Sequence, residues 1–150
     1  MELGYLLAVL GAAIVATFSG VGSALGVSIP ARAANGLLSE EPEKFGNTLI
    51  LVALPGSQGI YGFISGVMVL IVLGALGGQP KAPSLLQGCA ILGVCIFQTI
   101  VQWASSVLQG KVCAAGIAIV AKHPEDSMKG VVNAVMVETY AVLGLLITLL

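Results

Sequence analysis

Glu138 is the residue whose chemistry most needs an explanation, because it is the one charged residue within the apolar stretch 130–150. An ionised carboxylate at the centre of a membrane helix costs about 2.5–3.5 kcal/mol on insertion scales, so it is expected to face protein or a cavity. Ser57, Gln58 and Gln109 lie in other apolar stretches and are candidates to meet it. Carboxylate, amide and hydroxyl oxygens are the ligands that hard cations prefer. A single negative charge among neutral oxygens favours a monovalent cation over a divalent one.

The depth of these residues follows from two Pro-Glu turns. Gln109 precedes Pro124 by about four helical turns, and Glu138 follows it by nearly the same separation. In the other half of the chain, Ser57 and Gln58 follow Pro42 at a matching separation. At the constant rise of an α-helix, all four lie about 21–24 Å from their Pro-Glu turns, and hence at one level. The alternative is that these polar residues form interhelical hydrogen bonds without any ion.

Two further features belong to this level. Pro55-Gly56 interrupts a predicted helix just before Ser57, and a helical proline frees a backbone carbonyl of the preceding turn. Such carbonyls are tolerated at membrane depth where they line a protein site. Tyr61 lies about one turn beyond Gln58 and can contribute a phenolic hydroxyl.

The composition predicts membrane helices as the elements that hold these residues. Hydrophobic residues make up 57% of the chain and charged residues 9%, against about 25% charged in soluble domains. A soluble enzyme, a nucleic-acid-binding protein and a disordered chain are therefore excluded. The stretches 3–31, 45–80 and 82–110 carry no charge, and 130–150 carries only Glu138. Since a span needs about 20 apolar residues, the chain is predicted to be an all-α membrane protein with four transmembrane helices.

The two Pro-Glu pairs, at positions 42–43 and 124–125, indicate an internal duplication. We expect a single membrane domain, 1–150, made of one helical hairpin over 1–77, an external loop over 78–83 and a second hairpin over 84–150. At the offset that relates Pro42 to Pro124, Gly56 corresponds to Glu138. Each pair of hairpins would then carry one carboxylate.

The basic residues predict the orientation. Lys81 alone lies in the connection between the hairpins, whereas the others lie toward the two Pro-Glu turns. By the positive-inside rule, the connections within each hairpin are cytoplasmic and both termini face outward. The basic residues nearer the turns are Arg32, Lys44, Lys111, Lys122 and Lys129.

Small residues gather on the first helix of each hairpin. Gly22 and Gly26 form a small-xxx-small pair, and Ser19 and Ser23 form another. Such residues let helices approach closely, whereas Leu, Ile and Val suit a lipid-facing surface. The first helices are therefore predicted to be inner and the second ones outer, in a protomer suited to a tight ring of copies. A compact monomeric bundle is the alternative.

The chain resembles the two-hairpin proteolipid, the c or K subunit, of the V-type ATPases, and among these the bacterial sodium-translocating kind. The likeness covers essentially the whole length. It rests on PEKFG at 42–46, LPGSQGIYGF at 54–63, LQGKV at 108–112 and MVETYA at 136–141.

This resemblance implies a subunit of a membrane rotor ring, not itself catalytic, that is turned by ATP hydrolysis in other subunits. It implies that Glu138 carries one Na⁺ per protomer, with Gln58, Gln109, Ser57 and the Leu54 carbonyl as further ligands. Tyr61 would hold the Glu138 carboxylate. The implied partners are other copies of the chain, an arginine of the stator a or I subunit, central-stalk subunits at the cytoplasmic loops, and membrane lipid, without nucleic acid. The implied location is a prokaryotic plasma membrane.

Two other functions remain open at this stage. The same rotor could carry H⁺, with Glu138 protonated by virtue of its low-dielectric surroundings. A small multi-span transporter or channel could also use one membrane glutamate, but it would work as a monomer or dimer and would leave the duplicated turns unexplained.

Overall fold

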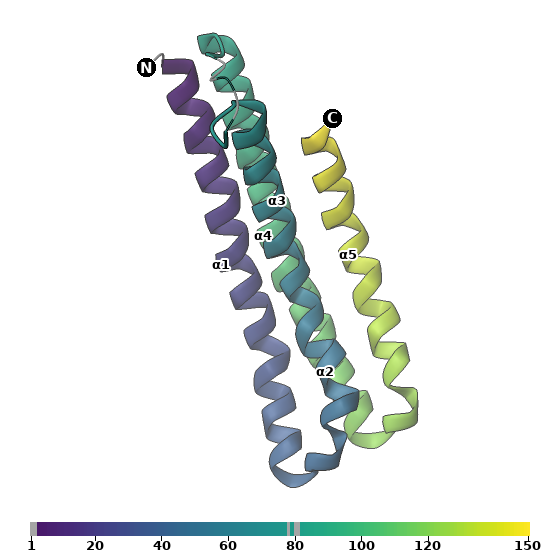
Figure 1. Cartoon of the computed structure of the whole chain (residues 1–150). Coiled ribbons are helices and arrows are strands. Elements are labelled where there is room, and N and C mark those ends of the chain that lie inside the picture. The colour runs from purple at the N-terminus through teal and green to yellow at the C-terminus, as the bar shows by residue number, and fades with distance from the viewer. Residues whose placement is uncertain (1–2, 78, 80–81) are drawn as a thin grey trace.

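The computed structural model describes residues 3–77, 79 and 82–150, and its regular elements there are all helical (Figure 1). Four helical segments are long and apolar enough to cross a membrane, which confirms the predicted all-α membrane fold of two hairpins. The second segment is divided by a short 3₁₀ turn. The elements are α1 (Leu3–Glu40), η1 (Pro42–Lys44), α2 (Phe45–Ala53), η2 (Leu54–Gly56), α3 (Ser57–Val72), α4 (Leu85–Lys122), η3 (Pro124–Asp126) and α5 (Ser127–Leu149).

Helices α1 and α4 continue beyond the charge-free stretches that predicted them. Each has 38 residues and is therefore about 57 Å long, against a hydrocarbon core of about 30 Å. Helix α1 runs past Arg32 to Glu40, and α4 runs past Lys111 to Lys122. A charged residue ends the part of a helix that can lie in lipid, but it does not end the helix, because Arg and Lys are good helix formers in water.

The first helices of the two hairpins make the most extensive contact in the bundle. Helix α1 packs most extensively against α4 and next against α3, whereas α5 packs chiefly on α4. Figure 1 shows α5 (yellow) standing at the edge of the bundle. The extensive contact between α1 and α4 fits their small residues, while their inner position in a ring stays a prediction.

The contact between α1 and α4 depends on glycine. A Cβ atom on Gly110 would meet the carbonyl oxygen of Gly26, and one on Gly26 would meet Ser106 Oγ. One turn away, a Cβ on Gly22 would lie 2.8 Å from the Cα of Trp103. The small-xxx-small pair of Gly22 and Gly26 therefore sets the close approach of the two backbones.

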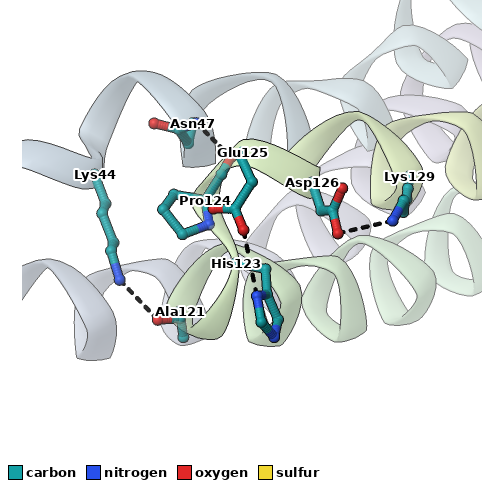
Figure 2. Close-up of polar contacts among 8 residues, drawn as sticks. All are labelled: Lys44, Asn47, Ala121, His123, Pro124, Glu125, Asp126 and Lys129. Carbon is teal, nitrogen blue, oxygen red and sulfur yellow. Dashed lines mark hydrogen bonds and ion pairs between the residues drawn. The ribbon is translucent and has the colours of Figure 1, made fainter.

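The two Pro-Glu turns are tied together at the same end of the bundle, as Figure 2 shows. Lys44 Nζ donates to the carbonyl of Ala121 at 2.7 Å, and Asn47 Nδ2 donates to the carbonyl of Pro124 at 3.0 Å. Lys44 also pairs with Glu41 at 2.7 Å. Because these contacts align the two hairpins, equal numbers of residues from each turn reach equal depths.

The connection between the hairpins is described only in part. Lys81, the basic residue predicted for this loop, lies outside the described residues, together with Gly78 and Pro80. Helix α4 begins immediately after it with a capping box. Ser84 Oγ accepts from the backbone N–H of Gln87 at 3.3 Å, while Gln87 Oε1 accepts from that of Ser84 at 2.9 Å.

Candidate ion-binding site

The structure brings four of the predicted site residues into one connected group of hydrogen bonds. Gln58 Nε2 donates to Gln109 Oε1 at 2.6 Å, and Gln109 Nε2 lies 3.3 Å from Glu138 Oε2. Tyr61 Oη donates to the other carboxylate oxygen, Glu138 Oε1, at 2.7 Å. The level estimated from residue counts is therefore the level at which these side chains meet.

Three segments position this group. Gln58 and Tyr61 belong to α3 and share a face because they are three residues apart. Gln109 comes from α4 and Glu138 from α5. Both amide side chains are completely buried, with 0% of their surface exposed, so each amide must find its partners inside the protein.

Ser57 and Leu54 lie beside this group. Ser57 Oγ donates to the carbonyl of Leu54 at 3.0 Å and lies 3.3 Å from Gln58 Oε1. The 3₁₀ turn η2 places this carbonyl next to the hydroxyl. All the residues expected as ion ligands therefore lie within one hydrogen-bonded neighbourhood.

The Pro55 carbonyl joins three helical segments, a role that the sequence did not predict. Its carbonyl accepts hydrogen bonds from Ser23 Oγ at 2.9 Å and from Ser106 Oγ at 2.6 Å. Ser23 also accepts from the N–H of Gly59 at 2.6 Å. The sequence suggests only a packing role for these two serines. Their hydroxyls link α1 and α4 to the break between α2 and α3, and so hold the turn that presents Ser57 and Gln58.

Glu138 has no cationic partner among the described residues. The ion pairs found there involve Lys44, His123 and Lys129, all at the turns. Lys111 is exposed and forms no ion pair with Glu138. The charge of an ionised Glu138 is therefore left for hydrogen bonds and for a bound cation to balance.

One side of the carboxylate is open. Glu138 and Tyr61 line a groove of about 410 Å³ between α3 and α5. The rest of its wall is apolar or nearly so, from Val135, Val142 and Leu143, with Thr139. An ion or a reagent can therefore approach Glu138 from this side.

The described part of the chain does not resemble a transition-metal site. No group of three or more His, Cys, Asp or Glu side chains gathers there. Cys95 and Cys113 are buried in helix packing, while Cys89 is exposed, and all three are free thiols. The oxygen-rich group around Glu138 is instead suited to a hard cation.

Comparison with known proteins agrees with this fold. The profile of the family described as the ATP synthase C subunit matches residues 10–69 and again residues 92–150. The chain therefore belongs to this family of non-catalytic membrane subunits and contains two copies of its hairpin.

Two characterised relatives narrow the comparison. The chain is 46% identical over 147 residues to the V-type sodium ATPase subunit K of Enterococcus hirae, covering 98% of this chain and 90% of that protein. It is 32% identical over 146 residues to the A-type ATP synthase subunit K of Methanocaldococcus jannaschii, covering 97% of this chain and 61% of that protein. The chain is thus a proteolipid subunit of the K type and a multi-pass membrane protein.

Proposed function

We propose that this chain is the rotor-ring subunit of a V-type ATPase and that it carries one Na⁺ per protomer on Glu138. The single observation that carries the proposal is the meeting of a carboxylate and two fully buried amides, supplied by three separate helices, at one level of the bundle. The name of the 46% identical relative, a sodium ATPase subunit, supports the choice of ion.

The proposed ligands are Glu138, Gln58, Gln109, Ser57 and the Leu54 carbonyl. An amide oxygen has two lone pairs, so Gln109 Oε1 can accept from Gln58 Nε2 and still coordinate an ion. Tyr61 Oη holds one carboxylate oxygen at 2.7 Å and fixes its direction. Five oxygen-bearing groups around a single negative charge give a neutral site when one Na⁺ is bound.

H⁺ remains the second candidate, because a proton requires only Glu138 and a shielded position. Sodium is favoured because both carboxylate oxygens lie within reach of a donor, Tyr61 Oη on one side and Gln109 Nε2 on the other. This is the pattern of an ionised carboxylate, which only accepts hydrogen bonds. Two buried amides are also costly unless their polar atoms are satisfied, and an ion between them accounts for both.

The reaction of Glu138 with a hydrophobic carbodiimide tests the choice of ion, because the reagent attacks only the protonated carboxyl group. Added Na⁺ is expected to displace the proton and to protect Glu138, with K⁺ far less effective. The measurement is the fraction of labelled protein against ion concentration at neutral and alkaline pH. Absence of protection by Na⁺ would establish the proton rotor instead, with Gln58 and Gln109 acting as interhelical hydrogen-bonding residues.

The proposed mechanism follows from the charge of the site. An occupied site is neutral and can turn past lipid, whereas an empty Glu138 is an unpaired anion that must stay near water or a cationic stator group. The stator a or I subunit would supply an arginine for this purpose, and central-stalk subunits would bind the ring at its cytoplasmic loops.

Gly56 lies at the position of Glu138 in the first hairpin, so each protomer carries one ion. Moving one charge against 100 mV costs about 2.3 kcal/mol. When fewer ions cross per turn of the ring, more ATP energy is available for each ion, which suits an ATP-driven pump.

We propose further that the two Pro-Glu turns are cytoplasmic and that both termini face outward across a prokaryotic plasma membrane. Single cysteines placed at Glu41 and Asp126, after replacement of the three native cysteines, are expected to react with a membrane-impermeant thiol reagent only from the cytoplasmic side. A cysteine at Gln79 is expected to react only from outside. Labelling of positions 41 and 79 from the same side of sealed vesicles would refute this topology.

A further inference from the structure

Helix α4 carries a polar stripe that extends well beyond the proposed ion site. Its members are spaced by four, three and four residues, so they share one face of the helix. Their exposed fractions lie between 0% and 6%, which makes the whole stripe a buried one. The stripe consists of Gln98, Gln102, Ser105 and Gln109.

Three members of the stripe are bonded to backbone carbonyls of α5 in regular antiparallel register. Gln109 Nε2 donates to the Ala134 carbonyl at 3.0 Å. Ser105 Oγ lies 3.4 Å from the Val137 carbonyl, and Gln102 Nε2 donates to the Ala141 carbonyl at 2.9 Å. These bonds therefore join α4 to the helix that carries Glu138 along several turns.

Gln98 breaks the pattern. It is only 2% exposed, yet neither its Nε2 nor its Oε1 has a hydrogen-bond partner within the described residues. Gln102 Oε1, one turn along the same face, also has none. Buried side-chain polar atoms in folded proteins are almost always paired with protein or with ordered water, so three such atoms in two neighbouring side chains indicate a bound group.

The chemistry of the three atoms identifies that group. They comprise one donor, Gln98 Nε2, and two acceptors, Gln98 Oε1 and Gln102 Oε1. A water molecule can accept from the donor while donating to both acceptors, which meets the two to four partners that a buried water needs. A cation would leave Nε2 unsatisfied, and its charge would have no counter-charge here, since Glu138 lies nearer to Gln109 at the other end of the stripe.

A glycine lies beside the Gln98 amide. Gly144 of α5 faces Gln98, and a Cβ atom there would lie 3.0 Å from Gln98 Oε1 and 2.7 Å from Val101 Cγ1. The glycine therefore lets α5 lie close to the amide without a side chain between them. A cavity of about 330 Å³, with Ser65, Ile91 and Thr148 in its wall, lies farther along the same helices. Ile91 is two turns from Gln98 on the same face, and Thr148 is one turn from Gly144.

We propose that Gln98 and Gln102 bind a buried water molecule. This water extends the row of hydrogen bonds between α4 and α5 beyond the ion site. The proposal does not depend on which ion Glu138 carries, because Gln98 lies on the far side of Gln102 from the carboxylate.

A structure of the assembled wild-type protein at about 2 Å resolution or better tests this directly. We expect one water oxygen within about 2.7–3.2 Å of Gln98 Nε2, Gln98 Oε1 and Gln102 Oε1. A direct bond between the two amides, with no water between them, would overturn the proposal. Data from crystals soaked in Tl⁺, a heavy monovalent cation, separate water from an ion. An anomalous peak between the two glutamines would overturn the proposal, whereas its absence there agrees with water.

Gln98→Met provides the matched variant, because it keeps the length of the side chain and removes both polar atoms. We expect loss of the water peak while Gln102 stays bonded to Ala141. Asn35→Met, which alters an exposed amide on α1, is the control and should leave the peak unchanged. A water that persists in Gln98→Met would show that Gln98 does not bind it and would contradict the proposal.

Discussion

Replacing Glu138 by Gln is expected to abolish ion transport and the ATP hydrolysis coupled to it. The substitution keeps the size of the side chain and removes the one charge at the site. Without that charge, a bound Na⁺ has no compensating anion in a low-dielectric environment, and a proton has no group to bind. The measurement is ²²Na⁺ uptake and ATPase activity of the complete complex in sealed vesicles, where both should fall to background.

The control for this variant is assembly. The native mass of the detergent-solubilised membrane complex should match that of the wild type and correspond to many copies of the chain, as a rotor ring requires. A mass of one or two copies for the wild type would instead support a small transporter. Glu138→Asp shortens the side chain by one methylene and is expected to weaken ion binding without abolishing it. Pumping by Glu138→Gln at a rate near that of the wild type would place the ion elsewhere.

Replacing Gln109 by Leu is expected to raise the Na⁺ concentration needed for half-protection of Glu138 by roughly fivefold or more. Gln109 is bonded to Gln58 Nε2, to the Ala134 carbonyl and to Glu138. Its loss removes an ion ligand and the shorter hydrogen bond of Gln58 Nε2, which keeps only the 3.5 Å contact with Ser105 Oγ. Leaving a buried polar group unsatisfied costs about 1–3 kcal/mol, and about 1.4 kcal/mol corresponds to a factor of ten in affinity.

Gln58→Leu should act in the same direction, because it removes the other amide of the pair. Gln87→Leu is the matched control, since Gln87 lies on the same helix as Gln109 but is exposed in its first turn. That variant should keep the protection curve of the wild type. Unchanged protection in both Gln58→Leu and Gln109→Leu would mean that the two amides only join helices and do not bind the ion.

Several features of the fold could be predicted because they depend on length and composition alone. Apolar stretches long enough to span lipid fix the number of membrane helices, and the repeated Pro-Glu turns divide the chain into two hairpins. The ends of α1 and α4 could not be predicted from charge. Arg32 and Lys111 mark where each helix extends beyond the lipid, but both helices continue past them.

The level of the site could also be predicted, and for a simple reason. The rise per residue of an α-helix is constant, so counting from the turns at Pro42 and Pro124 placed Gln58, Gln109 and Glu138 at one depth. The count depends on the two turns being level, and the contacts of Lys44 and Asn47 are what make them so. Those contacts join residues far apart in the sequence and were visible only in the structure.

The sequence by itself determined which residues lie at which depth, whereas the tertiary structure decided which of them face one another. Depth follows from a backbone rise that is the same for every residue, but the rotation of each helix about its axis is set by packing with its neighbours. The approach of Gly26 to Gly110 turns α1 and α4 so that Ser23 and Ser106 reach the Pro55 carbonyl. The same packing leaves Gln98 facing α5 without a protein partner among the described residues. Residue spacing alone does not give the rotation of α4 relative to α5, so this feature could be seen only in the structure.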